Sequence, residues 1–324
     1  IFIMFLENAI TRENKFWNYI VGSIIVIVAS FLGQIPFLIA VAVKSFSSGK
    51  AFPTDEKSVM SFLSPNLSLF LLLISFAVAL LVLYFVVKYF HKQTFLSVTT
   101  SRSRMDWKRF FFSFIIWGIF TIGSTVLMYY DSPENFSINF KPIPFAILAV
   151  IAIVLIPIQT STEEYVFRGY LMQGFANLAK NRWFPLVMTS VIFGTLHIAN
   201  PEVQKLGYIV MIYYIGTGFF LGIITLMDEG MELALGFHAA NNLIAALLIT
   251  SDWSAFQTES ILKDNSEPSA GLEVLIPVFV IFPLLLFLFS KKYKWTDWKE
   301  KLTGKINIVE VEPIQNIGNH DSNL

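Results

Sequence analysis

The chain has 324 residues, of which 55% are hydrophobic and 16% aromatic, while only 14% are charged. Its mean hydropathy of +0.63 exceeds what a water-soluble domain needs to fill its core, so lipid is the expected solvent. The absence of cysteine excludes a disulfide framework, a thiolate nucleophile and a cysteine-bound metal, and 23 basic against 23 acidic residues give no indication of a nucleic-acid partner.

Eight apolar stretches follow one another along the chain. The hydrocarbon core of a bilayer needs about 20 apolar residues per helix, and the first stretch is too long for the apolar part of a signal peptide. The fold class is therefore all-α, a polytopic membrane helix bundle of about eight transmembrane helices. These are expected at 17–43, 65–90, 109–130, 142–160, 184–199, 206–227, 232–250 and 272–290.

The fourth stretch continues into a segment that is helical in pattern but carries three charges. We interpret residues 163–179 as the second half of a long fourth element that is interrupted at Pro157 and ends at the inner membrane surface. A ninth span at this position would place the basic C-terminal segment outside the cell. The distribution of charge among the loops therefore favours eight spans.

Loop charge also predicts the orientation. Cytoplasmic loops are enriched in Lys and Arg, and the two most basic segments are 88–109 and 291–301, whereas 131–141 and 251–271 lean towards acid. With eight spans both basic segments lie inside and both acidic ones outside. We expect an integral membrane protein with both termini cytoplasmic.

The chain is expected to form one domain. We predict a single transmembrane helical domain over residues 1–305, whose motif-bearing core covers about 140–250, and a polar C-terminal tail over 306–324. No internal repeat is visible, which argues against a transporter built from paired repeats.

Only a few ionisable or amide side chains lie in or beside the apolar stretches and could carry chemistry. A charged side chain inside a bilayer costs about 2.5–3.5 kcal/mol on insertion scales, so each is a functional candidate. These side chains are Glu163, Glu164, Arg168, His197, His238 and Asn242.

Helical spacing assigns different roles to the two adjacent glutamates. Residues four apart share a helix face, so Glu164 is expected to pair with Arg168. Glu163 lies about 100° further around the helix and faces something else. The same spacing aligns Phe193 with His197, and His238 with Asn242. Three helices could thus direct polar groups at one buried position.

These residue types suit hydrolysis of an amide bond. A buried carboxylate beside a histidine can act as general base on a water molecule. A second histidine and an asparagine amide are donors that can stabilise an oxyanion. No serine or cysteine nucleophile is evident within the set, so an activated water is favoured over an acyl-enzyme.

Three motifs occur in order on successive apolar segments: Glu-Glu-x-x-x-Arg at 163–168, Phe-x-x-x-His at 193–197 and His-x-x-x-Asn at 238–242. Together they resemble the type II CAAX prenyl endopeptidases, also called the CPBP or Abi intramembrane proteases. The resemblance covers residues 140–250, a little over a third of the chain.

The resemblance implies an intramembrane endopeptidase with four catalytic residues. Glu163 and His197 would hold and activate the water, while His238 and Asn242 would form the oxyanion hole. Supporting roles fall to Glu164, Arg168 and Phe193. By the same analogy, the membrane would be a bacterial cell (inner) membrane. The expected partners are the lipid bilayer and a peptide or membrane-protein substrate, lipidated ones included, without nucleic acid.

Two alternatives stay open at this point. No cofactor is expected, but Glu163, His197 and His238 would also make a plausible zinc set, although the sequence has no HExxH helix. The other alternative is a non-catalytic membrane scaffold or a bacteriocin-immunity-type protein of the same family. Intact motifs argue against an inactive site.

Overall fold

The computed structural model describes residues 4–9, 14–54, 56–255, 257–267 and 271–306. Apart from Ile306, the polar tail expected at 306–324 lies outside these residues.

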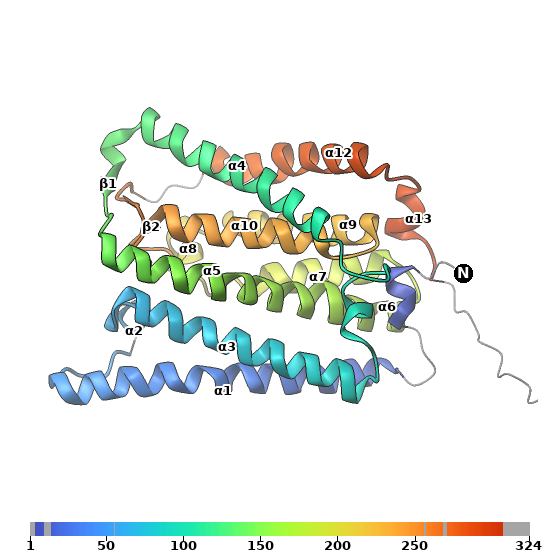
Figure 1. Ribbon diagram of the computed structural model, residues 1–324, viewed down its shortest axis with the longest axis horizontal. Coiled ribbons are helices and arrows are strands. Elements are labelled where there is room, and N and C mark those ends of the chain that lie inside the picture. Colours follow the sequence, from blue (N-terminus) through green and yellow to red (C-terminus); the bar gives the residue numbers. More distant parts are fainter. Residues whose placement is uncertain (1–3, 10–13, 55, 256, 268–270, 307–324) are drawn as a thin grey trace, which may run out of the picture.

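The described chain is almost entirely helical (Figure 1). The longer helices are α1 (Phe16–Ser48), α3 (Pro65–Phe85), α4 (Trp107–Asp131), α5 (Pro142–Glu164), α7 (Trp183–Thr195), α9 (Val210–Asp228), α10 (Glu232–Leu248) and α12 (Phe282–Tyr293). The shorter ones are α2 (Glu56–Phe62), α6 (Met172–Ala179), α8 (Pro201–Leu206), α11 (Leu272–Ile276) and α13 (Trp298–Thr303). Single 3-10 turns are η1 (Phe5–Ala9), η3 (Phe95–Val98) and η4 (Pro133–Asn135), and π-helical segments are η2 (Val86–Phe90), η5 (Tyr165–Leu171) and η6 (Pro277–Ile281).

All eight apolar stretches are helical, which confirms the polytopic membrane bundle. Within the described residues, 6 helices are long and apolar enough to cross a bilayer. The other two stretches form the shorter apolar helices α7 and α10. The count of eight crossings stays a prediction.

Two details of the expected helices are wrong. The fourth element is not interrupted at Pro157, because α5 passes through this proline and continues through η5 into α6. The fifth helix ends at Thr195 rather than at residue 199, and a turn follows. Pro201 prevents the helix from passing Asn200, because the residue before a proline avoids the helical region, and Asn200 is extended with ψ 144°.

Both the start of α1 and the end of α12 lie at one end of the bundle, together with α6 and α13 (Figure 1). We call this the basic end, because it also carries the segment 91–106. The opposite end, which we call the sheet end, holds α2 and a three-stranded sheet of β1 (Phe136–Ile138), β3 (Leu262–Asp264) and β2 (Ile249–Ser251). In this sheet β3 pairs antiparallel with β1 and parallel with β2.

Buried ion pairs close the basic end. Arg102 lies 3.0 Å from Asp228 and 3.1 Å from Glu232, and Arg109 lies 2.9 Å from the same Asp228 oxygen. The indole of Trp295 donates a hydrogen bond to the other oxygen of Asp228 at 3.1 Å. These contacts join the loop before α4, the turn between α9 and α10, and the segment after α12.

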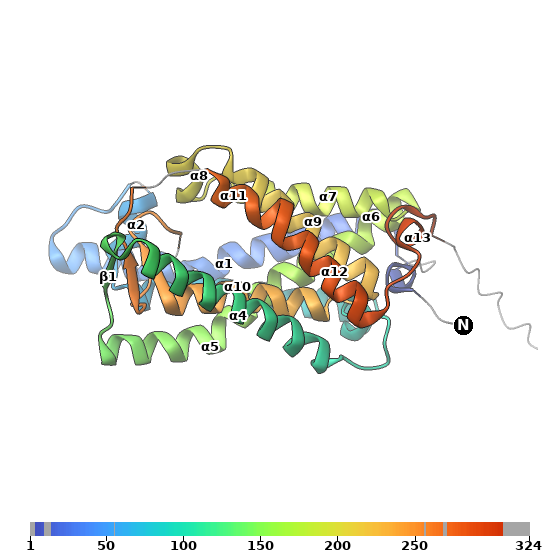
Figure 2. The ribbon, with the colours of Figure 1, turned by 90° about the horizontal axis from the view of Figure 1, so that it is seen from above.

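Helix α10 lies in the middle of the bundle, against α4, α5 and α9, and α7 packs on α9 (Figures 1 and 2). Glycines permit the closest approaches. A Cβ atom at Gly236 would lie 2.1 Å from the carbonyl oxygen of Phe110 on α4, and one at Gly218 would lie 2.6 Å from that of Ser190 on α7. Small residues at helix crossings let membrane helices pack at short range, and here they bring α10 against α4 and α9 against α7.

Candidate active site

The fully buried ion pair of Glu164 and Arg168 forms the base of the site. Arg168 Nη1 lies 3.0 Å from Glu164 Oε1, and both side chains have 0% exposed surface. The other terminal nitrogen of Arg168 donates to the carbonyl oxygen of Gly218 at 3.1 Å, which links η5 to α9. The π-helix η5 begins directly after Glu164, and such segments frequently occur at functional sites.

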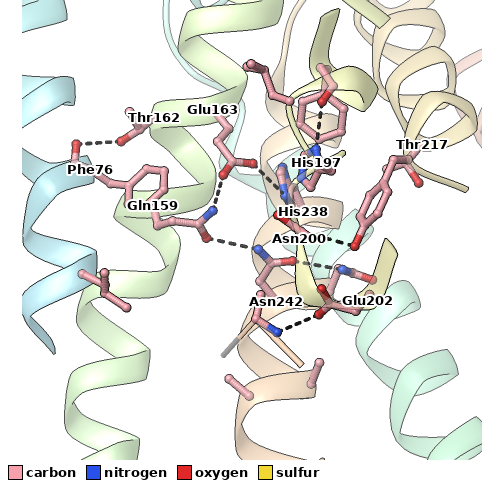
Figure 3. A pocket seen from close by; sticks show the side chains of 18 of the residues that line it. Phe76, Gln159, Thr162, Glu163, His197, Asn200, Glu202, Thr217, His238 and Asn242 are labelled. Atoms are coloured by element: carbon pink, nitrogen blue, oxygen red, sulfur yellow. Dashed lines mark hydrogen bonds and ion pairs between the residues drawn. The ribbon is translucent and has the colours of Figure 1, made fainter. Parts of the chain in front are cut away.

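His238 of α10 lies between the two glutamates of α5. Its Nδ1 is 2.8 Å from Glu164 Oε1. On the other side of the ring, its Nε2 is 3.5 Å from Glu163 Oε2 (Figure 3). A carboxylate accepts hydrogen bonds, so Glu164 requires the proton of the imidazole to be on Nδ1. The contact on the other side, with Glu163, then needs one further proton, either on His238 Nε2 or on Glu163.

Four ionisable groups, of which Glu164, Arg168 and His238 are buried and Glu163 is half-buried, can therefore balance their charge in two ways. With His238 as imidazolium, Arg168 and His238 offset Glu163 and Glu164. With His238 neutral, a protonated Glu163 leaves Arg168 and Glu164 to offset each other. Both states avoid a buried uncompensated charge, which would cost several kcal/mol. They differ only in the position of one proton between Glu163 and His238, as general acid–base chemistry requires.

Amide side chains hold Glu163 from the opposite side. Gln159, one helical turn earlier on α5, donates from Nε2 to Glu163 Oε1 at 2.5 Å. Its carbonyl oxygen accepts from Asn242 Nδ2 of α10 at 3.1 Å (Figure 3). Asn241 donates to Asn242 Oδ1 at 3.0 Å and accepts from the indole of Trp117 at 3.0 Å. A continuous series of hydrogen bonds thus runs from α4 through α10 to Glu163.

His197 follows α7 in the turn that precedes α8. Its Nδ1 lies 2.8 Å from the carbonyl oxygen of Phe193, so Nδ1 carries the proton and Nε2 is left as an acceptor. The imidazole stacks on the ring of Tyr214, with centroids 4.4 Å apart. The ring of Phe193 lies between the two histidines, 4.9 Å from His197 and 6.1 Å from His238.

All four residues expected to be catalytic line one cavity of about 810 Å³. Figure 3 shows Glu163, His197, His238 and Asn242 directed towards its interior. Phe193 also lines it, whereas Glu164 and Arg168 lie behind its wall. Such a volume is typical of a ligand site, and it can hold several residues of an extended peptide.

A metal centre was the alternative interpretation of this set. Among the side chains that the structure describes, no three His, Asp or Glu residues lie close enough together to hold one metal ion. Glu163 and His238 are adjacent, but His197 is not grouped with them as a third ligand. The absence of a cofactor stays a prediction.

The expected pairing of Glu164 with Arg168 is present, and polar groups from α5, from α10 and from the turn after α7 line one cavity. His197 lies in that turn and not on a helix as expected. Sequence reasoning missed the bond between Glu164 and His238, which depends on how α10 crosses α5. It also missed Gln159, because only charged and motif residues were considered. The spacing of four between Gln159 and Glu163 would have placed the amide on the same helix face.

Comparisons with known proteins place the three motifs within one protein family. The profile of the family "Type II CAAX prenyl endopeptidase Rce1-like" matches residues 139–244, which contain all three motifs. The chain is similar to a protein of Bacillus subtilis (strain 168) named "Uncharacterized protein YyaK", with 32% identity over 249 residues, 76% of this chain and 82% of the relative. No solved structure matches the chain significantly. The chain belongs to the Rce1-like family of type II CAAX prenyl endopeptidases.

Proposed function

We propose that this protein is an intramembrane endopeptidase that hydrolyses a peptide bond with a water molecule activated by Glu163. The observation that carries the proposal is the position of Glu163. Its carboxylate borders the cavity and is held by Gln159 on one side and His238 on the other. A general base needs this combination of fixed orientation, a proton-sharing neighbour and access to substrate.

The first step assigned to the site is attack of water on the scissile carbonyl carbon. Glu163 takes a proton from the water as its oxygen bonds to that carbon. His197 Nε2, an acceptor on the same cavity, orients the water by accepting its second hydrogen. The carbonyl oxygen becomes an oxyanion. The proton on Glu163 then passes to the leaving nitrogen, and the carbon–nitrogen bond breaks.

His238 and Asn242 are the proposed donors to that oxyanion. With Nδ1 bound to Glu164, His238 presents Nε2–H to the cavity when it is the imidazolium. Asn242 has two amide hydrogens, of which Gln159 takes one, so the second is available. Donors held in place before reaction act without reorganisation, and one such donor contributes about 10²–10³ in rate.

The proposed setting is a bacterial cell membrane, with the basic end on the cytoplasmic side. The relative from Bacillus supports a bacterial membrane. The basic segments around 91–106 and 291–301 support the cytoplasmic position of the basic end. The substrate is a peptide or a membrane-protein segment, with or without a lipid modification.

The protein purified into liposomes and incubated with a peptide library tests this function. Mass spectrometry should find new chain ends that form with the wild type but not with Glu163→Gln or His197→Phe. Serine- and cysteine-directed covalent inhibitors should leave cleavage unchanged, because the chain has no cysteine and no serine belongs to the catalytic set. Cleavage that persists in both variants would refute the proposal.

A further inference from the structure

One wall of the cavity is built by helices that carry none of the three motifs. Residues of α1 and α3 line the same cavity as Glu163 and His238. Both helices precede residue 139, where the match to the family profile begins. This wall is apolar except for three polar side chains, which are Ser30, Gln34 and Ser75. What these three bind is not assigned by the motifs.

Gln34 is an amide without a partner inside an apolar helix. It lies in the apolar run 17–43 of α1, it is half-buried, and it lines the cavity. Among the groups that the structure describes, none forms a hydrogen bond with its side chain. The amides of Gln159 and Asn242 on the same cavity are both bonded. An unpaired amide at this depth costs free energy, so a function for it is the default expectation.

Ser30 lies one helical turn before Gln34 and shares its face. A serine within a helix commonly donates to the carbonyl oxygen one turn earlier. Ser23 of α1 donates to Tyr19 in this way at 2.7 Å, and Ser75 donates to the carbonyl oxygen of Leu72 at 2.7 Å. Within the described part of the chain, the Ser30 hydroxyl has no such bond. Two adjacent polar groups on α1 are therefore available to a ligand.

Contacts through α3 place Gln34 at the depth of the proposed general base. A Cβ atom at Gly33 would lie 2.7 Å from Ser75 Cα, so α1 and α3 touch at this level. The next residue of α3, Phe76, accepts a hydrogen bond at its carbonyl oxygen from Thr162 of α5 at 3.0 Å (Figure 3). Gln34 and the catalytic glutamate directly follow the residues of α1 and α5 that make these contacts.

One extended peptide can reach both positions. Helix α3 packs between α1 and α5 (Figure 1), and the axes of packed helices lie about 8–10 Å apart. The axes of α1 and α5 are therefore at most about 20 Å apart. An extended chain advances about 3.3 Å per residue, so about six residues cover this distance.

The chemistry of a glutamine amide matches that of a peptide backbone. Its carbonyl oxygen can accept a backbone N–H, and its amino group can donate to a backbone C=O. A segment that is extended within the bilayer exposes both kinds of group, and each needs a partner because no bulk water is present. The apolar residues around Gln34 and Ser30 suit apolar side chains on the same segment.

We propose that Gln34, together with Ser30, binds the backbone of an extended apolar segment of the substrate, within about six residues of the scissile bond. The inference rests on the proposed peptidase function and deepens it. Gln34 is then a substrate-binding residue that determines which peptide bond lies beside Glu163.

Binding of peptides to the Glu163→Gln protein in detergent tests this, because that variant retains the α1 wall. A library of apolar peptides is screened for binding, and the amide bonds of a retained peptide are replaced one at a time by ester bonds, which lack the N–H. One replacement should weaken binding about tenfold more than its neighbours, as expected for a single hydrogen bond. Adding Gln34→Met should abolish that difference, and adding Ser30→Ala should reduce it in part.

Gln93→Met is the matched control. Gln93 is also half-buried, but it donates to the carbonyl oxygen of Asn8 at 3.2 Å and does not line the cavity. In the Glu163→Gln background it should leave the pattern of ester effects unchanged. Thermal unfolding separates binding from a structural role. Gln93→Met should unfold at a lower temperature because a hydrogen bond is lost, whereas Gln34→Met should unfold at no lower temperature than the wild type.

These measurements do not depend on catalysis. A peptide that binds with the Gln34-dependent ester effect but is not cleaved by the wild type would refute the peptidase proposal and leave the binding site in place. Three results would overturn the inference itself. These are ester effects that are the same with and without Gln34→Met, a lowered unfolding temperature of Gln34→Met, and a library from which no peptide binds.

Discussion

Glu164 accepts a hydrogen bond from His238 Nδ1 at 2.8 Å and at the same time pairs with Arg168 at 3.0 Å through the same carboxylate oxygen. The second motif glutamate therefore does more than neutralise an arginine. It fixes the orientation and the proton position of the histidine that faces Glu163. Such a carboxylate–histidine contact sets the tautomer in many enzyme sites.

Glu164→Gln is expected to weaken both folding and catalysis. Removing one partner of a buried ion pair costs about 3–5 kcal/mol, because Arg168 stays charged and buried. Thermal unfolding in detergent should show the loss of stability, and kcat should fall because His238 is no longer held.

A matched control for this variant is Glu232→Gln. Glu232 is also fully buried and lies 3.1 Å from Arg102, but at the basic end and away from the cavity. The Glu232→Gln protein should be less stable than the wild type but, once folded, should keep the wild-type kcat. If both variants keep kcat, Glu164 serves folding alone.

Gln159→Met should lower kcat by about 10–100-fold with little change in KM. Methionine keeps the volume but removes the hydrogen bonds that hold Glu163 and Asn242, so both lose their orientation. Steady-state kinetics on a cleavable peptide measure the two constants separately.

Gln173→Met is the control for removal of a buried amide. Gln173 has 0% exposed surface and donates to the carbonyl oxygen of Ser97, outside the cavity lining. Its substitution should reduce stability but leave kcat as in the wild type. A kcat for Gln159→Met equal to that of this control would remove Gln159 from the positioning of Glu163.

Much of the fold follows from the sequence, because every long apolar stretch became a helix close to its expected limits. The span 65–90 matches α3 and η2 together, and 232–250 differs from α10 by two residues at its end. These helices depend on local hydropathy, which sequence reports directly.

Contacts between helices could not be predicted from local hydropathy. His238 was aligned with Asn242 by its spacing, but its bond to Glu164 depends on the position of α10 against α5. That position depends on packing such as the contact of Gly236 with Phe110. The lining of the cavity is likewise a tertiary property, to which segments as distant as α1 and β3 contribute.

The burial of His91 predicts that the protein becomes less stable in mild acid. It follows the second span and is 3% exposed, and its Nε2 lies 2.7 Å from the hydroxyl of Tyr170. Burial lowers the pKa of His91 from 6.5 to about 4. Between these values only the unfolded chain takes up the proton, so the free energy of unfolding is fully retained above about pH 6.5 and falls as the pH approaches 4.

Thermal unfolding between pH 4 and 7 checks this. His91→Gln removes the titrating group, so its unfolding temperature should change less with pH across this window than that of the wild type. Parallel curves for the two proteins would mean that His91 does not contribute to the pH dependence.

Metal removal separates the two mechanisms that the sequence left open. If Glu163 acts directly on water, protein treated with a chelator and then freed of it should keep its full rate of peptide cleavage. Activity that disappears on chelation and returns with one equivalent of zinc would instead assign Glu163, His197 and His238 as metal ligands, with the metal activating the water.

The most direct test of the central claim is the ratio of kcat/KM between wild type and Glu163→Gln for one cleavable peptide, at equal unfolding temperature. Glutamine keeps the shape of the side chain and can still bond to Gln159, but it cannot take a proton. General acid–base catalysis typically contributes about 10²–10⁴ in rate, so the account predicts a loss of at least about 10²-fold with the fold intact. A folded Glu163→Gln protein that cleaves within a few-fold of the wild-type rate would contradict it.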